Sequence, residues 1–329
     1  MSDETKIEIA DAMQVNAIQN GLMRTNSTLR DDEWKRFDSE LLAIARQRLT
    51  AVSDLQSAGL TQDLGGLGTV VSLIETSSDL TPARVSIDGE TRSDDDRVEF
   101  GLLGYPVPIF RKDFKIGARQ LASSLSGNGS AGSTQGLDVT QMAIAARRVT
   151  DSMESMVFNG VPSLGTVDGY NLYGYTNHPN RLTQTLTGSW ATETGDNILS
   201  DTLAMLDQLY SVNRYGPFYM YVAKNIWANI QNDYDSSNSS NRTTKDRIEA
   251  LADVQVVRPG DSLADDTVVL VQMTRENVDL GVAQDLVNVE LSSNGDLLAP
   301  KKFMVFSSCA LRLKTDANGS LGVCVGLPA

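Results

Sequence analysis

Residues 137–160 read LDVTQMAIAARRVTDSMESMVFNG, and they contain the clearest helical pattern in the chain. Asp138 and Gln141 have the spacing of a capping box, which marks the start of a helix. Apolar residues then recur at steps of three and four, namely Met142, Ala146, Val149, Met153, Met156 and Val157. Asn159-Gly160 ends the pattern with a glycine at the position that commonly follows a helix. The sequence therefore predicts a long helix over residues 137–159, with its methionines packed in a core.

The segments before this helix predict an arm, a second helix and a projecting hairpin. Residues 1–30 are polar with scattered apolar positions, which favours an extended or partly helical arm. Residues 31–49 begin with acids and continue with apolar residues at helical spacing, so they predict an amphipathic helix. Residues 69–75 are apolar and β-branched enough for a strand. Residues 77–99 hold seven acids and three arginines, a composition that favours a long solvated hairpin.

The rest of the chain predicts helices in the middle and strands at the end. Pro106 and Pro108 exclude a helix and a central strand over residues 98–114, so we expect an edge or irregular strand there. Two further helices and a strand between them are expected at 196–210, 226–234 and 218–222. The closing strands are expected at 254–257, 268–272, 287–291, 303–313 and 321–325. The class is therefore α+β, with antiparallel strands at the end.

The composition of the 329-residue chain predicts a soluble protein with a sizeable core. Lysine and arginine number 28 against 42 acids, and the net charge of -14 argues against a generally basic surface that binds nucleic acid. No run of about 18 apolar residues is present, which excludes a membrane-spanning helix. The first residues lack the apolar region of a secretion signal, so we expect the chain to stay in the cytoplasm.

No constellation of residues predicts catalysis, a cofactor or a metal site. Residues 127–132 fit a dinucleotide-binding glycine pattern, but the strand that such a site requires does not precede them. The acids at 94–96 lack the remaining ligands of a calcium loop and suit a hairpin tip. His178, the single histidine, lies among Asn and Pro residues that indicate an exposed loop. Cys309 and Cys324 match neither a zinc nor a disulfide spacing, so we expect buried thiols.

The order of these features resembles the major capsid protein of tailed phages, whose Hong Kong 97-type fold is shared with encapsulin shells. The residues that carry the resemblance are YPVPIFRKDF at 105–114, GLD at 136–138, AARRV at 145–149, ESMVFNG at 154–160, AMLDQL at 204–209, YGPF at 215–218 and Ala223. The match covers about residues 31–325. It is similar to the encapsulin-like subgroup in its apolar segment, its helix start and its helix end.

The resemblance implies an α+β Hong Kong 97-type capsid fold and a division of the chain. The parts are an N-terminal arm at 1–30, the N-terminal helix of a peripheral domain at 31–65, an extended hairpin loop at 66–104, the peripheral domain at 105–164 with its spine helix at 137–159, an axial domain at 165–272 and returning peripheral strands at 273–329.

The resemblance also implies a role as a structural protein without enzymatic activity or cofactor. The first expectation is a major capsid protein that self-assembles into an icosahedral shell around a double-stranded DNA phage genome. The alternative is an encapsulin-like nanocompartment around cargo enzymes. The longer polar arm and the acidic insertion at 88–97 favour the viral shell, which would be assembled in the host bacterial cytoplasm and become the capsid of the virion.

The implied partners are further copies of the chain, in pentamers and hexamers. A portal protein, a scaffold or decoration proteins, and packaged DNA held by weak sequence-independent contacts would complete the particle, with no membrane. The hairpin supplies the charges that we expect at contacts between subunits: Arg84, Arg92, Asp94, Asp95, Asp96 and Arg97. Such exposed charges fix register and orientation more than they add affinity.

Some capsids of the resembled family join subunits by an isopeptide bond between a lysine of the extended loop and a neighbour's asparagine. No lysine lies between Lys35 and Lys112, and the arginines of the hairpin stay protonated and are poor nucleophiles. We therefore predict that mature particles boiled in denaturing detergent with reductant run as a monomer near 35.6 kDa. A ladder of covalent multimers on the gel would contradict this prediction.

Overall fold

The computed structural model describes residues 49–83, 85, 87, 95–117, 137–234, 242–291 and 300–328. They form two compact units, each made of segments that are distant in the sequence. Unit 1 contains the described parts of 109–150 and 285–307, and unit 2 contains those of 49–108, 151–284 and 308–329. The expected arm and helix before residue 49 and the glycine-rich segment at 127–132 lie outside the described residues.

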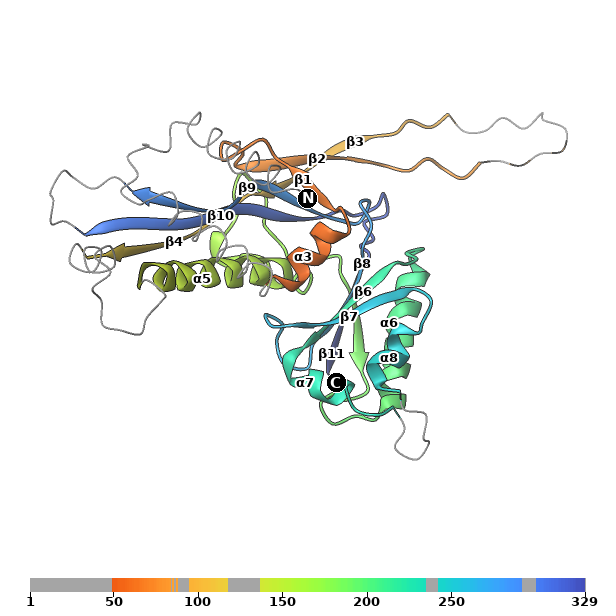
Figure 1. The fold of residues 1–329 in the computed structure, drawn as a ribbon. Coiled ribbons are helices and arrows are strands. Elements are labelled where there is room, and N and C mark those ends of the chain that lie inside the picture. The colour runs from red at the N-terminus through yellow and green to blue at the C-terminus, as the bar shows by residue number, and fades with distance from the viewer. Residues whose placement is uncertain are drawn as a thin grey trace, which may run out of the picture. The chain divides into compact units, whose positions relative to one another are not determined.

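The described elements form a mixture of helices and strands, which confirms the α+β class (Figure 1). The helices are α3 (Thr50–Ser57), α5 (Leu137–Asn159), η1 (Pro162–Leu164), α6 (Gly195–Ser211), α7 (Lys224–Ile230) and α8 (Thr244–Glu249). The strands are β1 (Thr61–Asp63), β2 (Val71–Ser77), β3 (Phe100–Pro106), β4 (Ile109–Ile116), β5 (Leu182–Leu186), β6 (Phe218–Ala223), β7 (Val254–Gly260), β8 (Val268–Gln272), β9 (Val278–Leu291), β10 (Lys301–Leu313) and β11 (Val323–Pro328).

A four-stranded sheet has the order β1-β9-β10-β4. Its strand β1 pairs in parallel with β9, with Thr61 opposite Leu280. The long strands β9 and β10, like helix α5, contribute residues to both units. Strand β4 lies at an edge of the sheet, which confirms the edge position expected from the prolines. Pro106 ends β3, and Pro108 falls in the gap before β4.

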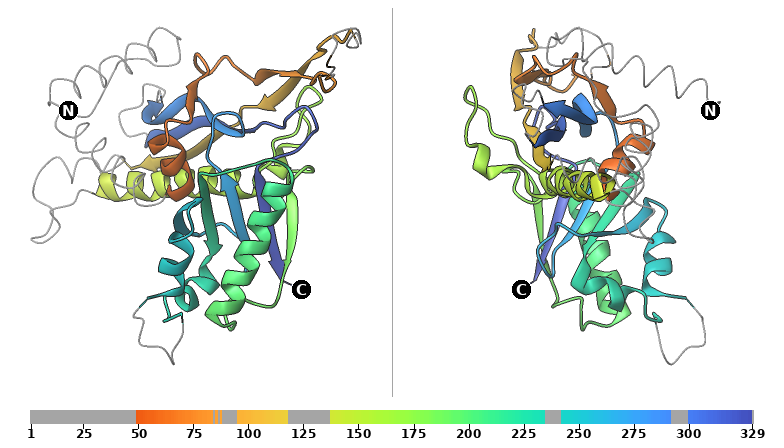
Figure 2. Two further views of the ribbon diagram at one scale, coloured as in Figure 1. Left: turned by 90° about the vertical axis from the view of Figure 1, so that its right-hand side faces the viewer. Right: turned by 60° about the vertical axis from the view of Figure 1, so that its left-hand side comes forward.

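A five-stranded sheet in unit 2 has the order β5-β11-β8-β6-β7 (Figure 1). The central strand β8 is buried at every position, and it runs antiparallel to β6 and β11, as expected for the closing strands. The expectation is wrong for β7, which pairs in parallel with β6. The reason is that α7 and α8 lie between these strands in the chain and supply the crossover that parallel pairing requires. Helix α6 packs on β5 and β11 (Figure 2), and α8 packs on β7.

Strands β2 and β3 form a two-stranded antiparallel ribbon in unit 2, and the ribbon is the projecting hairpin that we expected. Val71 lies opposite Pro106 at its base, and Ser77 lies opposite Phe100. Beyond the strands, Ser78 donates its backbone N–H to the Glu99 carbonyl at 2.9 Å, so the two arms stay together. Figure 1 shows the ribbon extending away from the rest of unit 2.

Helix α5 covers the 23 residues Leu137–Asn159, so its start and end confirm the predicted helix. The apolar residues that predicted it are buried: Met142, Ala146, Val149, Met153, Met156 and Val157. The next residue, Gly160, has a φ of 65°, in the left-handed region that favours glycine. A Cβ atom at this position would lie 2.5 Å from the carbonyl oxygen of Leu172. Glycine is therefore required here by the backbone conformation and by the close approach of another chain segment.

His178 is buried, so the expectation of an exposed loop histidine is wrong. Its exposed fraction is 7%, and its Nδ1 accepts a hydrogen bond from the backbone N–H of Asn180 at 3.1 Å. Burial and the nearby Arg181 lower the pKa of the imidazole to about 4, so the ring is neutral at physiological pH. The polar neighbours form a turn in which the Arg181 N–H donates to the His178 carbonyl at 3.2 Å, and the Tyr173 ring packs edge-on against the imidazole.

Two glycine substitutions separate the two requirements at Gly160. Gly165 has nearly the same φ of 67°, but a Cβ atom there would meet nothing within 4 Å. We expect Gly165→Ala to lower the free energy of unfolding by about 1 kcal/mol, the cost of the left-handed backbone. We expect Gly160→Ala to lower it by roughly 2–4 kcal/mol, because the clash with Leu172 adds to that cost. Urea unfolding of both variants measures the difference, and equal losses would contradict the prediction.

Candidate functional site

The six charged residues expected at subunit contacts belong to the hairpin, and the structure describes half of this set. Asp95, Asp96 and Arg97 are exposed on the segment that leads into β3. The remaining three, Arg84, Arg92 and Asp94, lie outside the described residues. The contacts of these charges with another subunit stay a prediction.

Asp96 has a role within the hairpin itself. Its Oδ2 accepts a hydrogen bond from the backbone N–H of Thr81 at 2.7 Å, across the gap between the two arms. Hydrogen bonding with Thr81 lowers the pKa of the Asp96 carboxyl, so the side chain is ionised at neutral pH. Asp96 therefore links the two arms of the hairpin within one chain.

One face of the ribbon carries a row of apolar side chains that the sequence analysis missed. Leu73 on β2 and Phe100 and Leu102 on β3 share this face, because residues paired across an antiparallel ribbon point the same way. Their exposed fractions are 54%, 74% and 60%. Glu75 lies opposite Leu102 and adds a charge to the same face. The alternation along β2 and the residues of β3 carried this signal, but the shared face appears only when the pairing is known.

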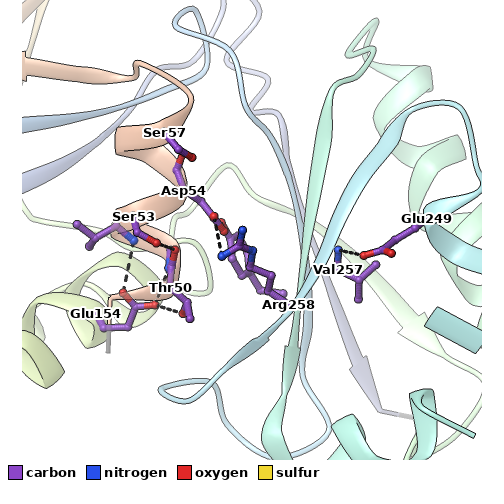
Figure 3. Close-up of polar contacts among 11 residues, drawn as sticks. Thr50, Ser53, Asp54, Ser57, Glu154, Glu249, Val257 and Arg258 are labelled. Atoms are coloured by element: carbon purple, nitrogen blue, oxygen red, sulfur yellow. Dashed lines mark hydrogen bonds and ion pairs between the residues drawn. The ribbon is translucent and has the colours of Figure 1, made fainter. Parts of the chain in front are cut away.

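A second group of unusual residues lies in unit 2 around the first turn of α3 (Figure 3). Glu154 on α5 is only 2% exposed. Its Oε1 accepts hydrogen bonds from Thr50 Oγ1 at 2.6 Å and from the Ala51 N–H at 2.8 Å, and its Oε2 accepts one from the Val52 N–H at 3.4 Å. Leu49, the N-cap residue of α3, provides no side-chain hydrogen bond. Glu154 therefore caps α3 from another helix.

Asp54, one turn further along α3, ties this helix to the five-stranded sheet. It is 1% exposed, and its Oδ2 accepts a hydrogen bond from the Tyr221 hydroxyl at 3.0 Å. Its Oδ1 lies 3.2 Å from Nη1 of Arg258 (Figure 3). The Arg258 side chain is partly exposed to solvent, unlike that of Asp54. Tyr221 belongs to β6 and Arg258 to β7. Helix α3 is thus bound to α5 through Glu154 and to two strands through Asp54.

Burial shifts the ionisation of the whole cluster. Desolvation raises the pKa of Glu154, opposed by the hydrogen bonds that it accepts, and raises the pKa of Asp54, opposed by Arg258 and then Tyr221. Desolvation also raises the pKa of the Tyr175 and Tyr221 hydroxyls. The rings of these two tyrosines stack with centroids 6.3 Å apart, and the Tyr175 hydroxyl has no hydrogen-bond partner.

Clustered ionisable groups with shifted pKa values occur in many catalytic sites, so the role of this cluster has to be decided on its contacts. The carboxylate of Glu154 is used to cap α3, and that of Asp54 is used by Arg258 and Tyr221. Both carboxylates are closed off from solvent and from any substrate. We therefore interpret the cluster as a structural junction. The sequence offered no signal for it, because about a hundred residues separate its two acids.

The remaining candidates of the sequence analysis have ordinary surroundings where the structure describes them. Cys309 and Cys324 are buried and form no disulfide, and burial raises the pKa of Cys324 to about 12, which makes it unreactive. Among the described residues, no three His, Cys, Asp or Glu side chains are placed to hold a metal ion. None of the helices in the described ranges is long and apolar enough to span a bilayer.

Comparison with known sequences gives two matches. The family described as a family of unknown function (DUF6260) matches residues 21–326. The type 1 encapsulin shell protein EncA of Myxococcus xanthus (strain DK1622) is 24% identical over 298 residues, which cover 89% of this chain and 93% of that protein.

Solved structures match the fold at low sequence identity. The virus-like particle from Pyrococcus furiosus has a TM-score of 0.61 at 17% identity, over 89% of this chain and 98% of that chain. The capsid of Myoviridae phage XM1 has a TM-score of 0.61 at 12% identity, over 84% of this chain and 91% of that chain. These likenesses confirm the encapsulin-like, Hong Kong 97-type fold that the sequence resemblance implied.

Variants of Glu154 test the structural reading of the buried cluster. Glu154→Ala leaves the Thr50 hydroxyl and the Ala51 N–H without their acceptor, and we expect it to lower the free energy of unfolding by about 2–4 kcal/mol. Glu154→Gln keeps an acceptor oxygen, so we expect a change within about 1 kcal/mol at neutral pH. Urea unfolding provides the measurement, and equal losses in the two variants would contradict the capping role.

The raised pKa of Glu154 also sets a pH dependence. Folding raises this pKa above its value in the unfolded chain, so the folded protein binds the proton more tightly. The contribution of Glu154 to stability is therefore fully present below the unfolded pKa and is lost as the pH rises through the folded pKa. As the pH rises above the ordinary pKa range of a glutamate, we expect the loss of stability to be smaller in Glu154→Gln than in the wild type. Identical pH profiles would show that Glu154 does not titrate in this range.

Proposed function

The chain belongs to a family of unknown function (DUF6260), and we propose that it is a major capsid protein that self-assembles into an icosahedral shell around a double-stranded DNA phage genome. The observation that carries the proposal is the exposed apolar face of the hairpin, on a chain with the Hong Kong 97-type fold. A second copy of the chain is the occupant that we propose for this face. The role is structural and needs no cofactor.

The energetics of the hairpin favour such a contact. A two-stranded ribbon is marginally stable alone, and it leaves Leu73, Phe100 and Leu102 in water. Burying each of these side chains against a neighbour contributes at most about 1.5–3 kcal/mol. The hairpin charges, including the exposed Asp95 and Arg97 on the segment that leads into β3, would select the orientation of the neighbour. The apolar side chains would then provide most of the affinity for the neighbouring subunit, and the charged side chains would fix how the two subunits align.

The acidic balance of the chain is compatible with a DNA-filled shell. With a net charge of -14, the shell would hold DNA through weak, sequence-independent contacts, which let the genome leave. Packaging by a motor through a portal would supply the work of filling. We keep pentamers and hexamers of the chain, a portal, and scaffold or decoration proteins as the proposed partners. The proposed locations are the host cytoplasm during assembly and then the virion.

The division of the chain into an arm, an extended loop, a peripheral domain and an axial domain also stays part of the proposal. In these terms the ribbon of β2 and β3 is the extended loop, α5 is the spine helix, and the five-stranded sheet belongs to the axial domain. This sheet includes β11, so the axial domain of the proposal also takes Val323–Pro328 from the 273–329 segment expected in the peripheral domain. The Glu154 cluster would then connect the spine helix with strands of the axial domain.

A second candidate function is an encapsulin-like nanocompartment shell that encloses cargo enzymes. The similarity to the encapsulin shell protein of Myxococcus xanthus favours it. The acidic insertion in the hairpin and the long polar segment before residue 31 favour the viral shell. Both candidates require shell assembly and differ in what the shell contains.

The contents of native particles distinguish the two candidates. Particles purified from the source cells should be closed shells by electron microscopy, with an absorbance ratio typical of double-stranded DNA and nuclease-resistant DNA inside. Genes for a terminase and a portal beside this gene would agree with that result. Closed shells with protein cargo and no genome would establish the nanocompartment instead. A purified chain that stays monomeric under all assembly conditions would overturn both.

The apolar face provides a test by substitution. We expect the double variant Leu73→Ser with Leu102→Ser to fold but to lose particle yield by roughly tenfold or more, because two contacts with the neighbour are weakened. Leu203→Ser is the control, since Leu203 is also exposed, at 47%, but lies on α6. Circular dichroism checks the fold, and sedimentation with electron microscopy measures the yield. Wild-type yield from the double variant would exclude this face as a contact.

A further inference from the structure

Two residues that face each other across the ribbon, Ser72 and Tyr105, hold the base of the hairpin against β10. We call these two contacts, with Arg312, the grip. Ser72 on β2 lies opposite Tyr105 on β3, and each is 6% exposed. Both point to the face opposite Leu73, toward the body of unit 2. Ser72 accepts a hydrogen bond from Arg312, and Tyr105 donates one to the carbonyl of Leu313. Arg312 and Leu313 are consecutive residues of β10. The position of this pair relative to β10 therefore fixes where the ribbon begins.

Arg312 is the centre of the grip. It is 2% exposed, and its guanidinium donates hydrogen bonds to three different strands. Nη1 donates to Ser72 Oγ on β2 at 3.0 Å, Nε donates to Asp279 Oδ1 on β9 at 2.5 Å, and Nη2 donates to Gln62 Oε1 on β1 at 2.6 Å. The other oxygen of Asp279 lies 2.6 Å from Lys314 Nζ. A planar group with fixed donors thus holds the hairpin in a fixed relation to the sheet.

Tyr105 and Gly104 complete the grip on the β3 side. The Tyr105 hydroxyl donates to the Leu313 carbonyl, and burial together with the nearby Asp279 raises the pKa of the phenol. On the opposite face, the ring of Tyr170 covers Gly104 so closely that a Cβ atom there would lie 2.5 Å from it. The base of the ribbon is therefore held on both faces.

Immediately beyond this pair the ribbon is separated from the body by a hollow. The hollow has a volume of about 230 Å³. Ile74, Thr76 and Leu103 line it from the hairpin, and Glu276, Lys314 and Asp316 line it from the body. Space next to the base leaves room for the ribbon to tilt. The contacts at the base, and not packing along the ribbon, therefore decide its direction.

We propose that Arg312 is a positioning residue that sets the direction of the hairpin, through its bond to Ser72 and with Tyr105 as the second contact. The inference rests on the proposed function, because a hairpin that joins subunits must be directed toward its neighbour before a shell can close. The inference predicts that a subunit without the hydrogen bonds of Ser72 and Tyr105 still folds and forms its ribbon but fails to assemble.

The variants follow from the geometry. Ser72→Ala removes only the acceptor on the hairpin and leaves the bonds of Arg312 to Asp279 and Gln62 in place. Tyr105→Phe removes only the second contact. The control is Tyr221→Phe, which removes a buried tyrosine hydroxyl bond elsewhere in unit 2. A purely structural role predicts that the double variant and this control differ only in stability.

The first measurement follows hairpin direction in the full chain, kept below the concentration at which particles form. Spin labels at Ser77→Cys on the ribbon and Ser200→Cys on α6 report one distance, since both native positions are exposed and the native thiols are buried. We expect a narrow distance distribution in the wild type and in Tyr221→Phe. We expect a distribution about twice as broad in Ser72→Ala with Tyr105→Phe, because releasing a bond to a charged group changes populations by tenfold or more. Unchanged width in the double variant would overturn the inference.

The second measurement is particle formation. We expect the double variant to give roughly tenfold fewer closed particles than Tyr221→Phe, although both chains fold by circular dichroism. Normal particles from the double variant would show that hairpin direction does not depend on this pair. If the wild-type chain itself forms no particles, the proposed function fails, and the distance distributions still decide whether Arg312 fixes the hairpin.

Discussion

A two-stranded ribbon has no second layer in which to bury its side chains, and this constraint governs how the structure is used. The hairpin of β2 and β3 leaves one apolar face in solvent, so its stability and its direction must be supplied from elsewhere. At its base the ribbon is stabilised and oriented by β10, through the buried Arg312 guanidinium and through the Tyr105 hydroxyl, which bonds to the Leu313 carbonyl. Along the exposed face the stabilisation would come from a neighbouring subunit. The exposed apolar face therefore makes the ribbon marginally stable in an isolated chain, and the same face would let it bind a neighbouring subunit.

The buried carboxylates of Glu154 and Asp54 solve a different problem with the same kind of interaction. Helix α3 is short and has no N-cap side chain of its own, so its first N–H groups would lack partners. Glu154 supplies the acceptor from α5, and Asp54 connects α3 to the sheet through Tyr221 and Arg258. The cost of burying these charges is visible in their raised pKa values. Their contacts join residues far apart in sequence, and they connect α3 both to α5 and to the five-stranded sheet.

The parts of the fold that could be predicted from the sequence are those with a local signal. The helical spacing of α5, its end at Gly160, the apolar run of β8 and the existence of the hairpin were all readable. Strands β1 and β5 were missed because one is short and the other is a polar edge, and both exist only through pairing with distant strands. For the candidate site, the contacts of the hairpin charges stay a prediction. These charges were visible in composition, whereas the apolar face of Leu73 and Leu102 and the grip of Arg312 depend on contacts made across the fold. His178 was misjudged for the same reason.

The long sequence separation inside the grip has a consequence for protein synthesis. Ser72 and Arg312 are 240 positions apart, and Tyr105 is 208 positions from Leu313. At about 5–20 residues per second, a ribosome needs roughly 10 to 50 seconds to pass from the hairpin to the strand that orients it. During that interval the two hydrogen bonds that orient the ribbon cannot form, because their partners on β10 have not been made. If the hairpin joins neighbouring subunits as proposed, the synthesis of β10 sets the earliest moment at which a chain can present it to a neighbour.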